Sequence, residues 1–283
     1  MNWKRILTVV LVLSSAVSVW AQGRIETKKF KIQDFRDRIT KVVLTGNEFK
    51  DGIMKREVID YWKVSPYEFC TMEEFGKLCT DKSLYFLLTV RGRIGKESQA
   101  GIDFLTLVKG GPEAKDGIDA MQEVVTIPYG PAGSGSGREF TYLSAILDII
   151  QDFTLNAMEK DIRGYSGLSI YNANLGKSRK ARLFFSEDDL SADADAAFMA
   201  RYAGLDVNVA EEDPVDAIFS EGTHNSLCGF MIAPEDAAAG SWCYKMLIGA
   251  YDHKLYYFKK HRIGPRKGKG FLPQDIKAIC KGR

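Results

Sequence analysis

The sequence predicts a mixed α/β fold in which two related units lie in tandem, joined by a long amphipathic helix. The pattern T-x-x-S-L occurs twice, at residues 80–84 and at residues 223–227. Around each copy, apolar runs of strand length alternate in the same order with segments of helical period. A glycine-rich segment and an amphipathic segment lie between the two halves. Alternation of this kind favours mixed sheets with helices packed over them.

The first unit, residues 22–129, is expected to run strand, helix, strand, helix, hairpin, helix. Its strands are short segments rich in β-branched and aromatic residues. We expect them at 41–45, 67–70, 84–90 and 102–108, with a further apparent strand at 124–127. Its helices are expected at 49–62, 72–78 and 115–122.

The second unit, residues 166–283, repeats this order. Its strands are expected at 182–185, 205–209, 227–232, 244–248 and 255–258, and its helices at 192–202, 214–219 and 274–280. The first strands correspond at an offset of 183 − 43 = 140 and the T-x-x-S-L segments at 226 − 83 = 143, so three inserted residues separate them. This register favours an internal duplication. The alternative is that any two α/β units of this size show a similar order of elements.

Residues 130–165 are expected to connect the units through a glycine-rich loop and a helix over 139–163. The helix carries a broad apolar stripe, which must be covered by one or both units. Its members are Phe140, Leu143, Ile146, Leu147, Ile150, Phe153 and Met158. The loop at 130–137 is followed by Arg138 and Glu139 where a phosphate-binding P-loop needs lysine and a hydroxyl residue. We therefore interpret it as a flexible connection and expect no bound nucleotide cofactor.

Residues 1–21 have the organisation of an export signal. Lys4 and Arg5 precede an apolar run over 6–19, and Val19-Trp20-Ala21 fits a signal peptidase site. We expect a periplasmic or secreted protein with no membrane span after cleavage, because no later apolar stretch approaches about 20 residues. Cleavage leaves 39 − 2 = 37 basic residues against 37 acidic ones. A neutral chain of this kind has no long-range field that would attract nucleic acid.

Acidic residues cluster just after the first strand of the second unit. Glu187, Asp188, Asp189 and Asp193 are candidate ligands for a divalent cation, because hard cations take several oxygen ligands. Asp195 lies just beyond them. The competing interpretation is helix capping, in which Ser191 accepts amide hydrogen bonds and Asp193 complements the helix dipole.

The five cysteines are an odd number and occupy unmatched places in the two halves. Cys228 and Cys243 flank a predicted hairpin and are the best candidates for a disulfide in an exported protein. The alternative is that they are buried free thiols, which behave as small apolar groups.

The carboxyl-terminal region is basic, with ten Lys and Arg and one Asp over residues 254–283. Lys259, Lys260 and Arg262, with Tyr257 beside them, form a candidate surface for a polyanionic ligand. The alternative is a charged edge strand with one buried aromatic face.

The three histidines, His224, His253 and His261, accompany no recognisable serine-nucleophile motif, and we expect His224 and His253 at the surface. The sequence thus favours a non-enzymatic binding or assembly scaffold, whose partner is an envelope protein or a polyanion. The alternative is an exported hydrolase that uses the acidic cluster with a divalent cation.

Overall fold

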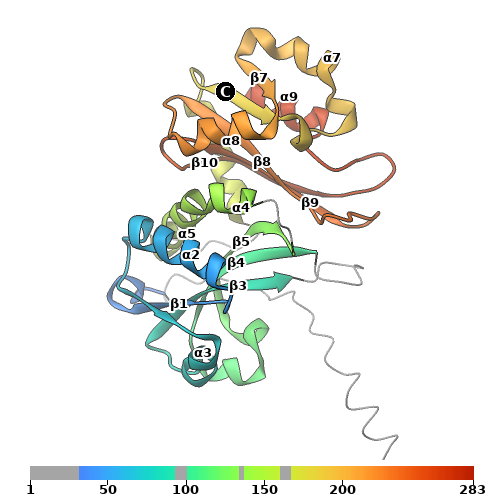
Figure 1. Ribbon diagram of the computed structural model, residues 1–283. Coiled ribbons are helices and arrows are strands. Elements are labelled where there is room, and N and C mark those ends of the chain that lie inside the picture. Colours follow the sequence, from blue (N-terminus) through green and yellow to red (C-terminus); the bar gives the residue numbers. More distant parts are fainter. Residues whose placement is uncertain (1–31, 93–100, 134–136, 160–166) are drawn as a thin grey trace, which may run out of the picture.

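The computed structural model describes residues 32–92, 101–133, 137–159 and 167–283, and it shows a mixed α/β fold with two five-stranded sheets (Figure 1). The expected export signal at residues 1–21 lies outside the described residues. In the described part of the chain, no helix is both long and apolar enough to cross a membrane.

The first sheet has the strand order β2-β1-β3-β4-β5. The strand β1 pairs in parallel with β2 and β3, while β4 is antiparallel to β3 and β5. The strands are β1 (Ile39–Val43), β2 (Tyr67–Cys70), β3 (Leu84–Gly92), β4 (Ile102–Lys109) and β5 (Gln122–Pro131).

The second sheet has the order β10-β9-β8-β6-β7. Here β6 pairs in parallel with β7 and β8, and β9 is antiparallel to β8 and β10. The strands are β6 (Arg182–Ser186), β7 (Val207–Ala210), β8 (Ser226–Ile232), β9 (Trp242–Gly249) and β10 (Leu255–Arg262).

Strand order and direction therefore correspond between the two sheets, with β1 matching β6 and β5 matching β10. The ladders place Ile39 opposite Leu84 and Leu183 opposite Leu227. Since Leu84 and Leu227 end the two T-x-x-S-L segments, Ile39 rather than Val43 corresponds to Leu183. A common origin of the two halves stays a prediction.

Most expected helices are present. In the first unit these are α2 (Glu48–Tyr61) and α3 (Met72–Leu78), and in the second α8 (Glu212–Ser220) and α9 (Pro273–Gly282). The helix expected at 115–122 is wrong, because Gly117, with a φ of 106°, separates two short 3₁₀ helices and β5 begins at Gln122. The helix expected at 192–202 is broken, since Asp195 caps a new start at α7 (Ala196–Met199) and a 3₁₀ helix (Ala200–Leu205) follows.

The connecting helix consists of α4 (Arg138–Thr141) and α5 (Leu143–Glu159), separated at Tyr142. The Tyr142 ring stacks on Phe230 and lies against Phe219, with both centroid distances 4.2 Å. Residues 160–163 of the expected helix lie outside the described residues. The stripe of α5 is covered as expected, because Ile146, Ile150 and Phe153 are fully buried.

One hydrophobic cluster, here called the shared cluster, contains side chains from both sheets and from α5. It receives α2 from the first unit and α8 from the second. Figure 1 shows α4 and α5 between the two units. Two smaller clusters lie on the outer faces, one under α3 and one under α7 and α9. The molecule is therefore layered, and its largest core lies between the two units.

Candidate functional site

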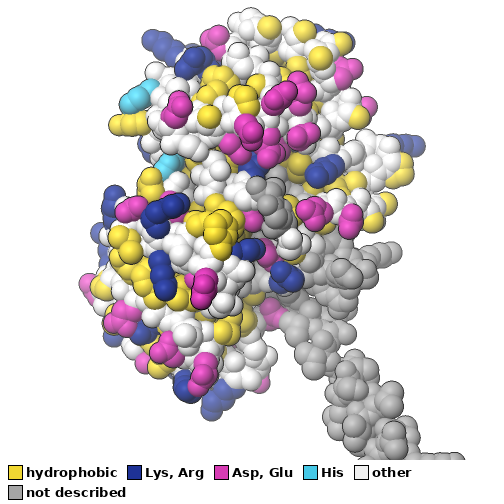
Figure 2. Space-filling view, viewed as in Figure 1, with side chains coloured by type: hydrophobic (Ala, Val, Ile, Leu, Met, Phe, Trp, Pro, Cys, Tyr) yellow, Lys and Arg dark blue, Asp and Glu magenta, His cyan; other side chains and the backbone are white. Residues whose placement is uncertain are grey.

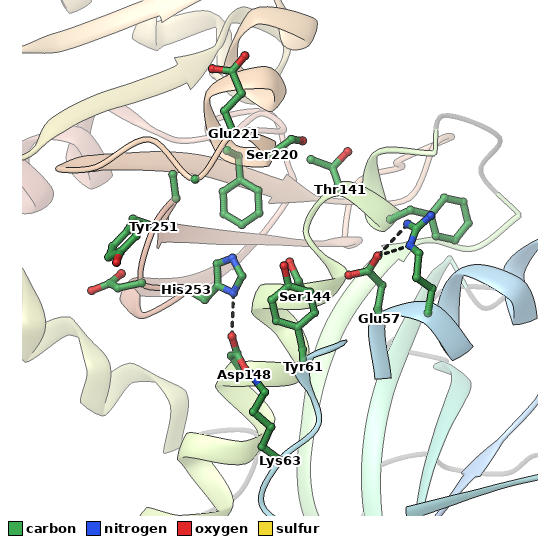
Figure 3. Close-up of a pocket in the computed structure, with 16 residues that line it drawn as sticks. Glu57, Tyr61, Lys63, Thr141, Ser144, Asp148, Ser220, Glu221, Tyr251 and His253 are labelled. Atoms are coloured by element: carbon green, nitrogen blue, oxygen red, sulfur yellow. Dashed lines mark hydrogen bonds and ion pairs between the residues drawn. The ribbon is translucent and has the colours of Figure 1, made fainter. Parts of the chain in front are cut away.

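A cleft of about 680 Å³ lies between the two units. Its walls are α2 and Lys63 from the first unit, α4 and the start of α5, the carboxyl end of α8, and the turn between β9 and β10 (Figure 3). Because these segments are far apart in the sequence, the cleft exists only when both units are folded and packed.

His253 is fixed at the centre of the cleft by several contacts. It adopts a φ of 52°, in the left-handed region that residues other than glycine seldom enter. Its Nδ1 is 2.7 Å from Oδ2 of Asp148 on α5. Its ring stacks on Phe219 at 5.7 Å and lies against Tyr61 at 5.4 Å. The turn backbone and these three contacts together fix the imidazole in one position in the cleft.

Besides Tyr251, four side chains with hydroxyl groups line the same cleft: Tyr61, Thr141, Ser144 and Ser220. In Figure 3 they surround the same space as Glu57 and His253.

Within the described chain, none of the four hydroxyls hydrogen-bonds another protein group. Thr154, on the same helix as Ser144, differs from them, because its hydroxyl donates to the Ile150 carbonyl at 2.7 Å. Ser144 is only 7% exposed, yet its hydroxyl faces the cleft without a protein partner. A nearly buried polar group of this kind requires a partner from solvent or from a ligand.

Three of the four carboxylates of the lining have partners within the chain. Arg56 pairs with Glu57 at 2.8 Å, and Asp148 is bound by His253. Asp252 accepts from the Tyr256 hydroxyl at 2.9 Å. Burial, then the nearby Glu57 and Asp148, raises the pKa of Tyr61, so its phenol stays protonated and can donate a hydrogen bond.

An aromatic pair stands at the rim of the cleft. The His224 and Tyr251 rings stack with centroids 3.6 Å apart, and Tyr251 is 61% exposed. A ring that is held by a stacked neighbour loses little entropy when a ligand packs on it.

A comparison of the chain with known protein families, with curated proteins and with solved structures finds no match.

The acidic cluster is spread out by the fold. Glu187, Asp188 and Asp193 are exposed, whereas Asp189 is fully buried and forms a two-pronged ion pair with Arg138 at 2.7 and 2.9 Å. Asp195 caps α7 by accepting from the Phe198 amide. Figure 2 shows acidic side chains gathered on the second unit, around the place of α8 in Figure 1. Among the described residues, no three His, Cys, Asp or Glu side chains converge as metal ligands.

The basic candidates of β10 lie on two faces of the sheet. Tyr257 is buried and donates to Asp275, and Lys259 also pairs with Asp275 at 3.1 Å. Lys260 and Arg262 lie instead over the Trp242 ring, at 4.5 and 4.4 Å. Burial and the nearby Arg262 lower the pKa of Lys260 to about 8. The four residues therefore do not form one surface, and a polyanionic partner stays a prediction.

Cys228 and Cys243 are free thiols, and the expected disulfide between them does not form. The ladders place Ile248 opposite Cys228 and His261 opposite Cys243. Cys228 belongs to the shared cluster, whereas the Cys243 sulfur contacts Gly270 on the other face of the sheet. Burial raises the pKa of these thiols to about 12 and about 11.

Sequence reasoning expected His224 and His253 at the surface and missed the cleft. The available signal was weak: Tyr251 and His253 occupy a turn, where one residue takes a left-handed conformation. Nothing in the sequence links this turn to Ser144 or to Tyr61, because their contact depends on how the two units pack.

Proposed function

We propose that this chain is an exported binding module that holds a small polar ligand in the cleft between its two units. The observation that carries the proposal is the cleft itself, to which both units contribute and in which polar side chains face one space. Pockets that bind small molecules commonly form where two domains meet.

The preorganised position of the His253 side chain supports this function. His253 is held by Asp148, Phe219 and Tyr61, which are all groups of the protein itself. Side chains ordered in advance lower the entropy that a ligand must overcome, so the same contacts give tighter binding.

Export and duplication belong to the same proposal. The basic start, apolar run and small residues of positions 1–21 support cleavage after Ala21. The matching strand orders support a duplicated unit. Amino-terminal sequencing of the protein from the envelope or medium should begin at Gln22, and an intact Met1 there contradicts export by this signal.

A hydrolase is the second candidate, favoured by one observation. Asp148 binds Nδ1 of His253, which leaves Nε2 as the nitrogen that can accept a proton, as in a general base oriented by a carboxylate. Turnover of a bound ligand that is lost in His253→Gln, with binding retained, favours this candidate. Unchanged ligand after long incubation favours the binding module.

The direct test is thermal unfolding of the protein with a panel of small metabolites at high concentration. A ligand at about 100 times its Kd adds about 2.7 kcal/mol of stability, enough to raise the Tm by several degrees. Ser220→Trp places a large ring at an exposed position of the cleft and should abolish the shift. Ala197→Trp, at an exposed position of α7, is the matched control and should retain it.

The proposal fails if stabilising ligands act equally on the protein with Ser220→Trp, because binding then lies elsewhere. It also fails if no small polar compound stabilises the protein.

A further inference from the structure

We infer that the ligand of the cleft is an uncharged polyhydroxylated molecule, of the chemical class of a mono- or disaccharide. This inference rests on the proposed function and specifies the substrate class of the same cleft. Three observations carry it: the unused hydroxyl groups, the balance of charges, and the aromatic surfaces.

Much of the hydrogen-bonding capacity in the cleft belongs to hydroxyl groups. Tyr61, Thr141, Ser144 and Ser220 come from both units and from the connecting helix, and their hydroxyls have no partner within the described chain. A hydroxyl both donates and accepts, and it rotates to suit its partner. A ligand with several hydroxyls of its own can satisfy such a set, whereas a ligand with a single charged group leaves most of it unused.

The charge of the lining argues against an anionic ligand. Four carboxylates and only two permanent cations line the cleft, a balance of 2 − 4 = −2 with neutral imidazole. Arg56 already pairs with Glu57. The other cation, Lys63, is exposed, and it lies at the opposite end of the site from Glu221 (Figure 3). A phosphate or a carboxylate entering this field meets net repulsion.

The carboxylates also suit a sugar. Glu57 has one oxygen, Oε1, engaged by the Arg56 guanidinium, and its carboxylate retains further acceptor sites. In Figure 3 that carboxylate faces the same space as Ser144 and Thr141. An ionised acceptor forms a stronger hydrogen bond to a ligand hydroxyl than a neutral acceptor does.

Aromatic rings supply the apolar contacts that a sugar ring needs. The C–H faces of a pyranose are apolar, and they pack on aromatic rings while the hydroxyls point outward. Tyr251, supported by His224, offers such an open ring at the rim. The cleft volume of about 680 Å³ lies within the range of about 300–1,000 Å³ found for sites of small ligands.

The test measures affinity by calorimetry with defined probes. The neutral probes are D-glucose, D-galactose, D-mannose, N-acetylglucosamine, maltose and cellobiose, and the charged probes are glutamate, lysine and inorganic phosphate. We expect at least one neutral probe to bind and the charged probes to bind at least about tenfold more weakly. Ser144→Ala should lower the affinity for the neutral probe by about three- to tenfold, as expected for the loss of one hydrogen bond.

Thr154→Val is the matched control, because it removes a hydroxyl of the same helix that is already bonded to Ile150. It should leave the affinity unchanged. Tyr251→Ala should lower the affinity for the neutral probe by a similar factor. It should not alter the fold, because Tyr251 is exposed. Circular dichroism of each variant confirms that it is folded.

The outcomes separate the two proposals. If a charged probe binds best and Ser220→Trp abolishes that binding, the cleft is a ligand site and the sugar class is wrong. If none of the neutral probes binds, the sugar class is likewise wrong. If a neutral probe binds but Ser220→Trp leaves its affinity unchanged, both proposals are wrong.

Discussion

Arg138 is almost completely buried and faces three carboxylates of the second unit. Besides Asp189, its guanidinium contacts Asp216 at 3.1 Å and Glu212 at 3.4 Å. It also lies over the Phe230 ring at 5.5 Å. Burial raises the pKa of Asp189 to about 6 in spite of the guanidinium, so this carboxylate is ionised at neutral pH only with Arg138 beside it. The pair fixes the start of the connecting helix to the second unit.

Replacing Arg138 should therefore be strongly destabilising. We expect Arg138→Met to lower the free energy of unfolding by about 3–5 kcal/mol, because it leaves Asp189 buried without a counter-charge. Urea unfolding at pH 7 measures this. Arg36→Met, at an exposed position, should change the value by less than about 0.5 kcal/mol. Adding Asp189→Leu to Arg138→Met should restore most of the loss, and a double variant as unstable as the single one contradicts the account.

A second buried network holds α9 against the outer face of the second sheet. Lys245, fully buried on β9, contacts Asp275 on α9 and Nδ1 of His261 on β10. Nε2 of His261 donates to the Gly268 carbonyl at 2.8 Å. Since Nδ1 faces an ammonium donor, the imidazole is neutral. Burial and the Lys245 charge lower the pKa of His261 despite the Gly268 contact.

This network predicts a loss of stability in mild acid. Because the pKa of His261 is lower in the folded state, the unfolded chain binds more protons once the pH falls below about 6.5, so stability decreases from there downward. His261→Asn retains an acceptor for Lys245 and cannot titrate in this range. Its unfolding free energy should vary less between pH 7 and pH 5 than that of the wild type. Equal slopes for the two proteins contradict the neutral assignment of His261.

At the scale of elements, the sequence predicted those whose ends carry local signals. The segments 67–70 and 72–78 match β2 and α3, because Thr71 and Glu74 form a capping box between them. The repeated T-x-x-S-L marks a turn in both halves: Asp81 accepts from the Ser83 amide in the first, and Asn225 takes a φ of 54° in the second. For the edge strand β5, the sequence predicted a strand only over 124–127. Its first residue was assigned to a helix and its last two residues to the glycine-rich loop, because pairing with β4 extends the strand beyond its local signals.

Two glycines of the first unit provide an element-scale prediction. A Cβ on Gly110 would lie 2.0 Å from the Asp81 carbonyl oxygen, in the turn before β3, whereas a Cβ on Gly76 in α3 meets nothing within 4 Å. We expect Gly110→Ala to cost at least about 1–3 kcal/mol, because backbone must move. Gly76→Ala should instead stabilise by about 0.5–1 kcal/mol, through helix propensity. Thermal unfolding compares them, and equal effects contradict the turn geometry.

At the scale of the whole molecule, the two units turn different faces inward. The helix after the first strand, α2, packs in the shared cluster in the first unit, but its counterpart α7 lies on the outer face of the second. Conversely, α8 packs in the shared cluster, whereas its counterpart α3 lies on the outer face of the first unit. If the halves are copies, the sheet face that the first unit turns toward the shared cluster is equivalent to the outer face of the second unit. Sequence patterning cannot reveal this arrangement, because both faces of each sheet are apolar. The cleft was missed for the same reason.

The shared cluster predicts that the two units unfold together. Calorimetry should give one transition whose measured enthalpy matches the van't Hoff enthalpy, as for a single cooperative unit. Ile146→Ala in α5, at the centre of the shared cluster, should lower the Tm of the entire transition through a loss of about 2–5 kcal/mol. Two resolved transitions would show that each unit has an independent core.

The central claim is that the space between the units is where a ligand binds. A crystal structure of the protein grown with its tightest sugar probe tests this most directly. The account predicts electron density for the sugar between α5 and α8, within hydrogen-bond distance of the Ser144 and Ser220 hydroxyls. Density on any other surface, with the cleft holding only solvent, would contradict it.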